Sequence, residues 1–143
     1  IRKLIAEGDV GDASAMLGYS YSLYGVVVAG NRIGRTMGFS TANMQLYEPL
    51  KLVPGNGVYA VSVETLGRKY RGMCNIGNRP TVGPANARTV ETNIFGFDED
   101  IYGLDIKVTF RKKIRDEVKF CSMDALRDQL QKDRQKCLVL NTL

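Results

Sequence analysis

The sequence predicts a mainly β domain, built as a small antiparallel barrel with helices only at its two ends. Six segments have the composition or alternation of strands and are separated by glycine-containing turns, and helical patterns occur only near the termini. Alternation alone does not distinguish a barrel from a sandwich. We expect one domain over residues 1–143, with a helical lead-in at 1–18, the barrel at 19–120 and a helix at 121–143.

The first predicted element is one or two short helices within residues 1–17. Gly8 interrupts the helical pattern, and Asp9 suits the N-cap of the second turn because its carboxylate accepts from free backbone N–H groups. Gly18 suits the C-terminal stop.

The strands follow in order, and the final element is a helix. Gly67 and its neighbours join the third and fourth strand segments, which therefore read as a hairpin. Ser122 is a good N-cap for the last helix, and Asp124 lies where the helix dipole favours an anion. The predicted strands are 23–29, 41–46, 58–66, 69–76, 90–97 and 104–114.

The composition excludes several classes of enzyme, because the chain contains no histidine. A Ser-His-Asp or Cys-His nucleophile, a His-ligated metal and a His general base are all excluded. Acid–base chemistry must fall to Asp, Glu, Lys, Tyr, Cys or Arg. The net charge of +5 fits nucleic acid and a small phosphate-bearing ligand equally well. No basic surface interleaved with aromatic residues stands out, so we expect no nucleic-acid partner.

Other features bear on the compartment in which the protein is found and on whether the chain is part of a longer protein. Cys74, Cys121 and Cys137 are far apart and form no CxxC pair, so we expect reduced thiols, no zinc knuckle and a cytoplasmic location. No apolar run approaches the roughly 20 residues needed to span a bilayer, and no signal peptide is evident. The chain begins at Ile1, so we expect a domain cut from a longer protein.

A glycine-punctuated loop is the first candidate for chemistry. It lies within residues 30–43, GNRIGRTMGFSTAN, where Gly30, Gly34 and Gly38 let backbone N–H groups approach phosphate oxygens closely. Arg35 adds a guanidinium that matches phosphate geometry. The segment has neither the Walker A pattern nor a dinucleotide fingerprint. A flexible hairpin with solvated arginines remains the alternative.

Two oxygen-bearing side chains follow this loop. Thr41 and Asn43 are two residues apart, so in a strand they share one face. Their neutral oxygens suit a hard cation such as Mg²⁺.

Glu91 is the candidate general base. In a strand, Glu91, Asn93 and Phe95 face one way. A carboxylate inside a barrel mouth could accept a proton from a substrate hydroxyl, and a reference carboxyl pKa of about 4.3 leaves it ionised at pH 7. The alternative is a solvent-facing strand glutamate. Arg115, just after the last strand, could stack on or donate to a planar ligand, or belong to a solvated loop.

Together these segments resemble the riboflavin kinase family, in order and over nearly the whole chain. The matching segments are 34–43 (GRTMGFSTAN, family pattern GRxxGFPTAN), 57–60 (GVYA), 75–81 (NIGNRPT, pattern NIGxRPT), 91–103 (ETNIFGFDEDIYG, pattern ExHIFxFDxDxYG) and 115–120 (RDEVKF, pattern RDExKF).

The resemblance implies a six-stranded Greek-key barrel with a C-terminal helix across it, and the transfer of phosphate from ATP to riboflavin, giving ADP and FMN. By the same resemblance, residues 30–38 cover the ATP phosphates, Thr41 and Asn43 hold Mg²⁺, Glu91 accepts the proton of the ribityl 5′-hydroxyl, and Arg115 borders the flavin.

In bacteria, such a module usually follows an FMN adenylyltransferase half, and we expect that arrangement here. Two residues depart from the family pattern: Ser40 stands at its proline and Asn93 at its usual histidine. Because these changes could weaken Mg·ATP binding or catalysis, a non-catalytic flavin or nucleotide sensor on the same barrel is the alternative function.

Overall fold

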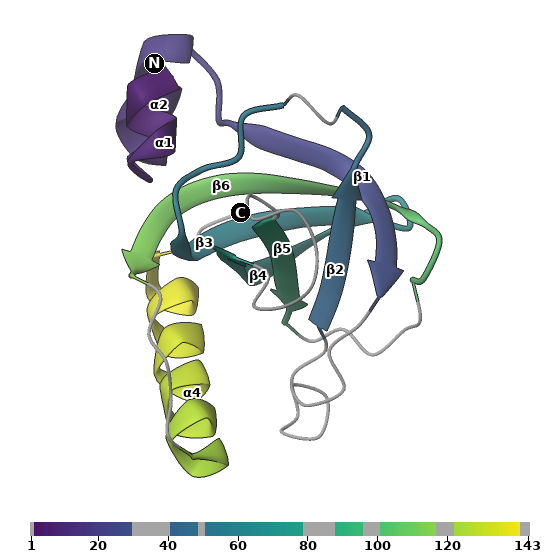
Figure 1. The fold of residues 1–143 in the computed structure, drawn as a ribbon, viewed down its shortest axis with the longest axis vertical. Helices are drawn as coiled ribbons and strands as arrows, with labels where there is room; N and C mark the ends of the chain where they lie inside the picture. The colour runs from purple at the N-terminus through teal and green to yellow at the C-terminus, as the bar shows by residue number, and fades with distance from the viewer. Residues whose placement is uncertain are drawn as a thin grey trace.

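Six antiparallel strands close into a barrel in the computed structural model, which describes residues 2–29, 41–48, 51–78, 88–95, 101–116 and 122–140 (Figure 1). The strands are β1 (Ser22–Ala29), β2 (Thr41–Leu46), β3 (Gly57–Thr65), β4 (Arg68–Asn78), β5 (Arg88–Ile94) and β6 (Asp105–Arg115).

The order of strands around the barrel is β1-β2-β5-β4-β3-β6. Strands β3, β4 and β5 are consecutive neighbours, and β6 returns to lie beside β3, which is the Greek-key arrangement. The closed ring removes the sandwich as an alternative and confirms the predicted fold class. All six predicted strands are present; β5 begins two residues earlier than expected and ends at Ile94, because Phe95, which was expected within the strand, lies in a turn.

Helices are found only at the two ends of the described chain, as the sequence predicts. The N-terminal pair is α1 (Arg2–Ala6) and α2 (Val10–Leu17), and the C-terminal helix is α4 (Met123–Leu140). The caps are confirmed: the Asp9 side chain accepts from the backbone N–H of Asp12 at 3.3 Å, and Gly18 adopts the left-handed conformation with φ 81°. The Ser122 hydroxyl accepts from the backbone N–H of Ala125 at 3.1 Å.

The barrel interior forms the main hydrophobic core. Its largest buried rings, Tyr59 and Phe110, pack edge to face with centroids 5.3 Å apart. Ile5, Val10 and Ala13 of the N-terminal helices join the same core. The helices α1 and α2 therefore pack against the barrel and cover part of its surface (Figure 1).

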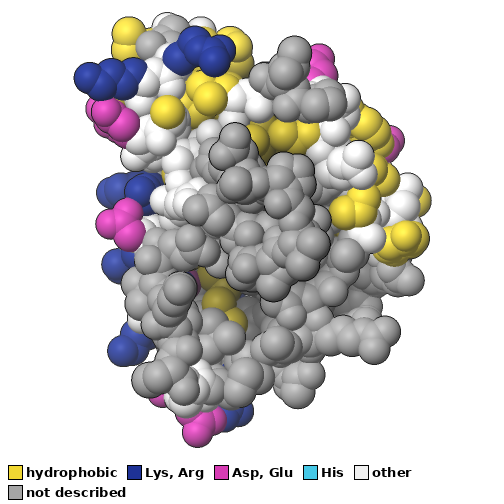
Figure 2. Space-filling model, viewed as in Figure 1, with side chains coloured by type: hydrophobic (Ala, Val, Ile, Leu, Met, Phe, Trp, Pro, Cys, Tyr) yellow, Lys and Arg dark blue, Asp and Glu magenta, His cyan; other side chains and the backbone are white. Residues whose placement is uncertain are grey.

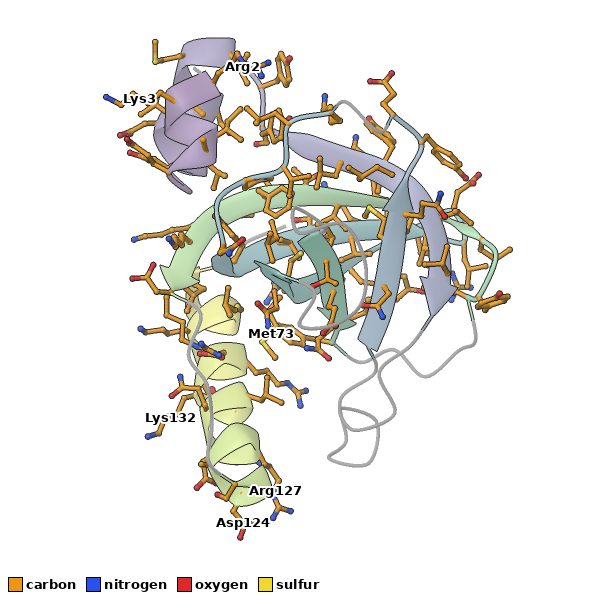
Figure 3. The ribbon with its side chains drawn as sticks, in the orientation of Figure 1. Arg2, Lys3, Met73, Asp124, Arg127 and Lys132 are labelled. Atoms are coloured by element: carbon orange, nitrogen blue, oxygen red, sulfur yellow. The ribbon has the colours of Figure 1, made fainter. Side chains whose placement is uncertain are left out.

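A second, smaller core lies on the outer wall of the barrel, beneath α4. Val58, Ala60 and Met73 of β3 and β4 are buried there with Cys137 of α4. Figure 3 shows Met73 on the side of the barrel that faces α4, whereas Asp124 and Arg127 lie at the end of the helix that is far from the barrel. This packing fixes α4 beside β4.

On the face shown in Figure 2, the side chains of Lys and Arg lie mostly along one edge.

No helix in the described ranges is both long and apolar enough to cross a membrane.

Gly72 in β4 leaves no room for a side chain. A Cβ built there would lie 2.4 Å from the backbone oxygen of Asn93 in β5. Because this neighbour is backbone, Gly72→Ala must separate the two strands, and we expect it to lower the free energy of unfolding by about 1–3 kcal/mol in urea denaturation. Gly11→Ala in α2 is the control, since an added Cβ there meets nothing within 4 Å. Equal stability of the two variants would contradict the steric account.

Candidate active site

A row of three polar side chains crosses neighbouring strands of the barrel. Asn43 of β2 lies opposite Glu91 of β5, and Glu91 lies opposite Asn75 of β4. Side chains at directly opposed positions of antiparallel strands project from the same face, with Cβ atoms about 5 Å apart. The strand pairing therefore places one carboxylate between two side-chain amides. We call Asn43, Glu91 and Asn75 the polar row.

The polar row lies on the outer wall of the barrel. Val90, Thr92 and Ile94 of β5 are buried in the interior at 5 % exposure or less, whereas Glu91 on the alternate face is half-buried. Phe95, on the same face as Glu91, packs against the small core beneath α4. The alternation predicted for β5 is confirmed, but Glu91 is on the outside of the wall and not inside a barrel mouth.

The amide oxygens of the row are unusual for buried groups. Oδ1 of Asn43 and Oδ1 of Asn75 are buried, and no partner within the described residues hydrogen-bonds to either. A buried acceptor without a partner typically costs about 1–3 kcal/mol. Two such oxygens beside a carboxylate form a set of hard oxygen donors, which suits Mg²⁺ or a hydroxyl-bearing ligand.

Cys74 of β4 lies directly behind the row, in the barrel interior. Burial raises the pKa of its thiol to about 12; contact with the Thr92 hydroxyl opposes this shift, and the nearby Glu91 charge adds to it. At neutral pH this thiol is almost entirely protonated, so it is not a nucleophile. Within the described ranges no group of three or more Asp, Glu and Cys side chains could hold a metal ion.

An ion pair joins the end of β6 to α4. The Nε and Nη2 atoms of Arg115 donate to both carboxylate oxygens of Asp133 at 2.9–3.0 Å, and Nη1 donates to the backbone oxygen of Asp116. Gln129 also donates to Asp133 at 2.9 Å. The Asp133 side chain is 1 % exposed and that of Arg115 is 17 % exposed. This fork-to-fork pair holds α4 against the barrel.

The comparisons with known proteins fit this geometry. Residues 17–140 match the family model of flavokinase, described as riboflavin kinase. The chain belongs to the riboflavin kinase family. This confirms the family that the sequence motifs indicate.

Relatives of this kinase family support the assignment. A bifunctional riboflavin kinase/FMN adenylyltransferase of Bacillus subtilis is 41 % identical over 140 residues, which is 96 % of this chain and 44 % of that protein. The chain thus spans less than half the length of this curated relative. The solved riboflavin kinase of Trypanosoma brucei has a TM-score of 0.57 and 28 % identity, over 82 % of this chain and 76 % of its own. Another solved chain, named a macrolide-efflux protein from Streptococcus pneumoniae, has a TM-score of 0.88 and 39 % identity, over 96 % and 44 % of the two chains.

The structure brings some of the predicted site residues together. Asn43 and Glu91 are adjacent, as described above, and Thr41 begins β2 opposite Asn93. The predicted loop residues Gly30, Gly34, Arg35 and Gly38, and the departure at Ser40, lie outside the described residues.

Sequence reasoning did not propose Asn75 or Asp133 as site residues. Asn75 lies within a matched motif, but only the pairing of β4 with β5 shows that it flanks Glu91. Asp133 carries no motif signal; its burial against Arg115 is the only indication of its role.

The Arg115–Asp133 pair should be essential for the position of α4. Asp133→Ala leaves a largely buried guanidinium without its carboxylate, so we expect the free energy of unfolding to fall by about 3 kcal/mol or more. Asp124→Ala is the matched control, because Asp124 also pairs with an arginine of α4 but is 83 % exposed. Thermal or urea denaturation measures both. Similar stability of the two variants would contradict the anchoring role.

Proposed function

We propose that this chain is a riboflavin kinase domain that transfers the γ-phosphate of ATP to the ribityl 5′-hydroxyl of riboflavin, giving FMN and ADP. One observation carries the proposal: strand pairing sets Glu91 between the buried amide oxygens of Asn43 and Asn75, on a chain that belongs to the riboflavin kinase family. Phosphoryl transfer needs positioning and neutralisation of charge more than covalent chemistry.

Glu91 is proposed as the general base. Its carboxylate accepts the proton of the ribityl hydroxyl while the hydroxyl oxygen attacks the γ-phosphorus and the bond to the ADP oxygen breaks. A strand buried on its inner face and paired on both sides holds this carboxylate in a fixed place, which favours a near-attack arrangement. General-base assistance is typically worth about 10²–10⁴-fold in rate.

The residues of the row fit a hard cation. We propose that Asn43, together with Thr41, holds Mg²⁺, because the buried amide oxygen of Asn43 has no hydrogen-bond partner within the described residues and is the ligand type that Mg²⁺ prefers. When bound, the ion supplies positive charge to the phosphate oxygens. Asn75 is proposed to position the substrate hydroxyl from the opposite side of Glu91.

Other sequence predictions remain part of the proposal. Residues 30–38 are proposed to cover the ATP phosphates and Arg115 to border the flavin, with its guanidinium oriented by Asp133. The length of the bacterial relative supports an FMN adenylyltransferase half in the full protein. The cytoplasmic location stays a prediction. Because these relatives are named as riboflavin kinases, they do not favour the alternative function of a non-catalytic flavin or nucleotide sensor.

The kinase proposal has a direct assay. Incubating the chain with riboflavin, ATP and Mg²⁺ should give FMN, measured by chromatography. Glu91→Gln keeps the shape of the side chain but removes the base, so kcat should fall about 10²–10⁴-fold with little change in the Kd of riboflavin. Glu7→Gln, the same change at an exposed turn residue directly after α1, is the control and should leave kcat unchanged.

Two outcomes would contradict the proposal. If the wild-type chain binds riboflavin but forms no FMN, the kinase function is overturned and a sensor is favoured. Near wild-type turnover of Glu91→Gln would leave the kinase function standing and overturn the role given to Glu91.

A further inference from the structure

A pocket lies on the opposite side of the barrel from the polar row. It is formed over β1, β6 and β3 and has a volume of about 360 Å³. In the ring of six strands, β6 is three places from β5 in either direction. The pocket is therefore separate from the proposed kinase site by the full width of the barrel.

Strand register builds the floor of this pocket from two rows of polar side chains. In one row Ser22, Thr109 and Ser62 are successive partners on β1, β6 and β3. The hydroxyls of Ser22 and Thr109 are 3.0 Å apart, and Nε of Arg111 donates to the hydroxyl of the buried Ser62 at 3.1 Å. Arg111 is thereby held with its two terminal nitrogens directed away from that bond.

The second row holds charge and an aromatic ring. Tyr24, Lys107, Glu64 and Lys69 are successive partners across β1, β6, β3 and β4. The Lys107 ammonium contacts both neighbours: it lies 5.2 Å from the centroid of the Tyr24 ring and 3.4 Å from the Glu64 carboxylate. The hydrogen bond with Tyr24, and to a lesser extent Glu64, raises the pKa of Lys107, although partial burial opposes this.

The charges around the pocket do not balance. Four basic side chains line it against the single carboxylate of Glu64, which is already paired with Lys107. Within the described part of the chain, Lys51, Lys69 and Arg111 form no ion pair with a carboxylate. Three cations around one concave surface create a positive potential that favours an anion.

Aromatic rings complete the lining. Tyr19 and Tyr24 are 64 % and 53 % exposed at the rim, and Tyr21 is buried below with the Lys51 ammonium 5.0 Å from its centroid. Exposed rings beside cations and hydroxyls are suited to a ligand that has a planar ring and a phosphate group.

We propose that this pocket is a second ligand site, which binds a nucleotide: the phosphate contacts Arg111 and Lys69, and the base stacks on an exposed tyrosine ring. The volume decides in favour of a small ligand, because it lies near the lower end of the usual range for small-molecule sites. A single strand of nucleic acid would need a longer groove. The site does not depend on the proposed kinase activity.

The test uses AMP, which has no γ-phosphate to transfer, with the ¹⁵N-labelled chain observed by NMR. The amide signals of Tyr24, Lys107 and Thr109 should shift and saturate at millimolar AMP. The variant K69Q/R111Q should raise the Kd from these signals about tenfold or more, because both proposed phosphate contacts are lost. The matched control R127Q/K132Q removes the same two charge types from exposed positions of α4 (Figure 3) and should change this Kd less than about twofold.

Because Arg111 also contacts Ser62, K69Q alone is measured as well; it changes an exposed residue and should still weaken binding. Adenosine without phosphate should shift the same signals far less than AMP. The proposal is overturned if AMP leaves the pocket signals unmoved, if the two double variants bind equally, or if adenosine binds as well as AMP. It is also overturned if only a single-stranded oligonucleotide moves these signals.

Discussion

The hydrogen bonding of β5 between β2 and β4 is the interaction on which the candidate site depends. Strand β2 is distant in sequence from β4 and β5, and the register of the three strands brings Asn43, Glu91 and Asn75 together. In antiparallel pairing, a slip of one residue would turn Glu91 into the barrel interior and Thr92 outward. The buried inner face of β5 prevents such a slip, because it would bury a carboxylate and expose the apolar residues Val90 and Ile94.

The wall of this barrel separates stability from chemistry by the alternation of side chains. The interior is filled by aliphatic and aromatic residues, with Tyr59 and Phe110 at its centre. The outer wall is used in three ways: beneath α4 it forms a small apolar core, on β2, β5 and β4 it carries the polar row, and on β1, β6 and β3 it carries a basic pocket. The Arg115–Asp133 ion pair holds α4 against the end of β6, next to this small apolar core. A compact fold can therefore hold separate candidate binding surfaces without loss of interior packing.

Local signals predicted the elements of this fold well. The caps at Asp9, Gly18 and Ser122 depend on neighbouring backbone groups, and the alternation along β5 depends on a two-residue period, so both can be read from the sequence. The order of the strands cannot be predicted in this way, because it depends on pairing between residues far apart in the sequence. Periodicity, for example, does not show that β2 lies beside β5. Asn75 was missed because its place beside Glu91 depends on this long-range pairing. Asp133 was missed because the sequence does not distinguish a buried aspartate of a helix from an exposed one; only the structure places Arg115 against it.

The most direct test of the central claim is to locate the bound nucleotide–metal complex relative to the polar row. With Mn²⁺ and ATP added to the ¹⁵N-labelled chain, paramagnetic broadening falls steeply with distance from the metal. At Mn²⁺ and ATP concentrations well below the millimolar range in which AMP should fill the basic pocket, we predict that the amide signals of Asn43, Glu91 and Asn75 broaden first and together, while those of Tyr24 and Thr109 across the barrel persist. Broadening centred on any other part of the chain, with the polar row unaffected, would contradict the claim that these three strands form the phosphoryl-transfer site.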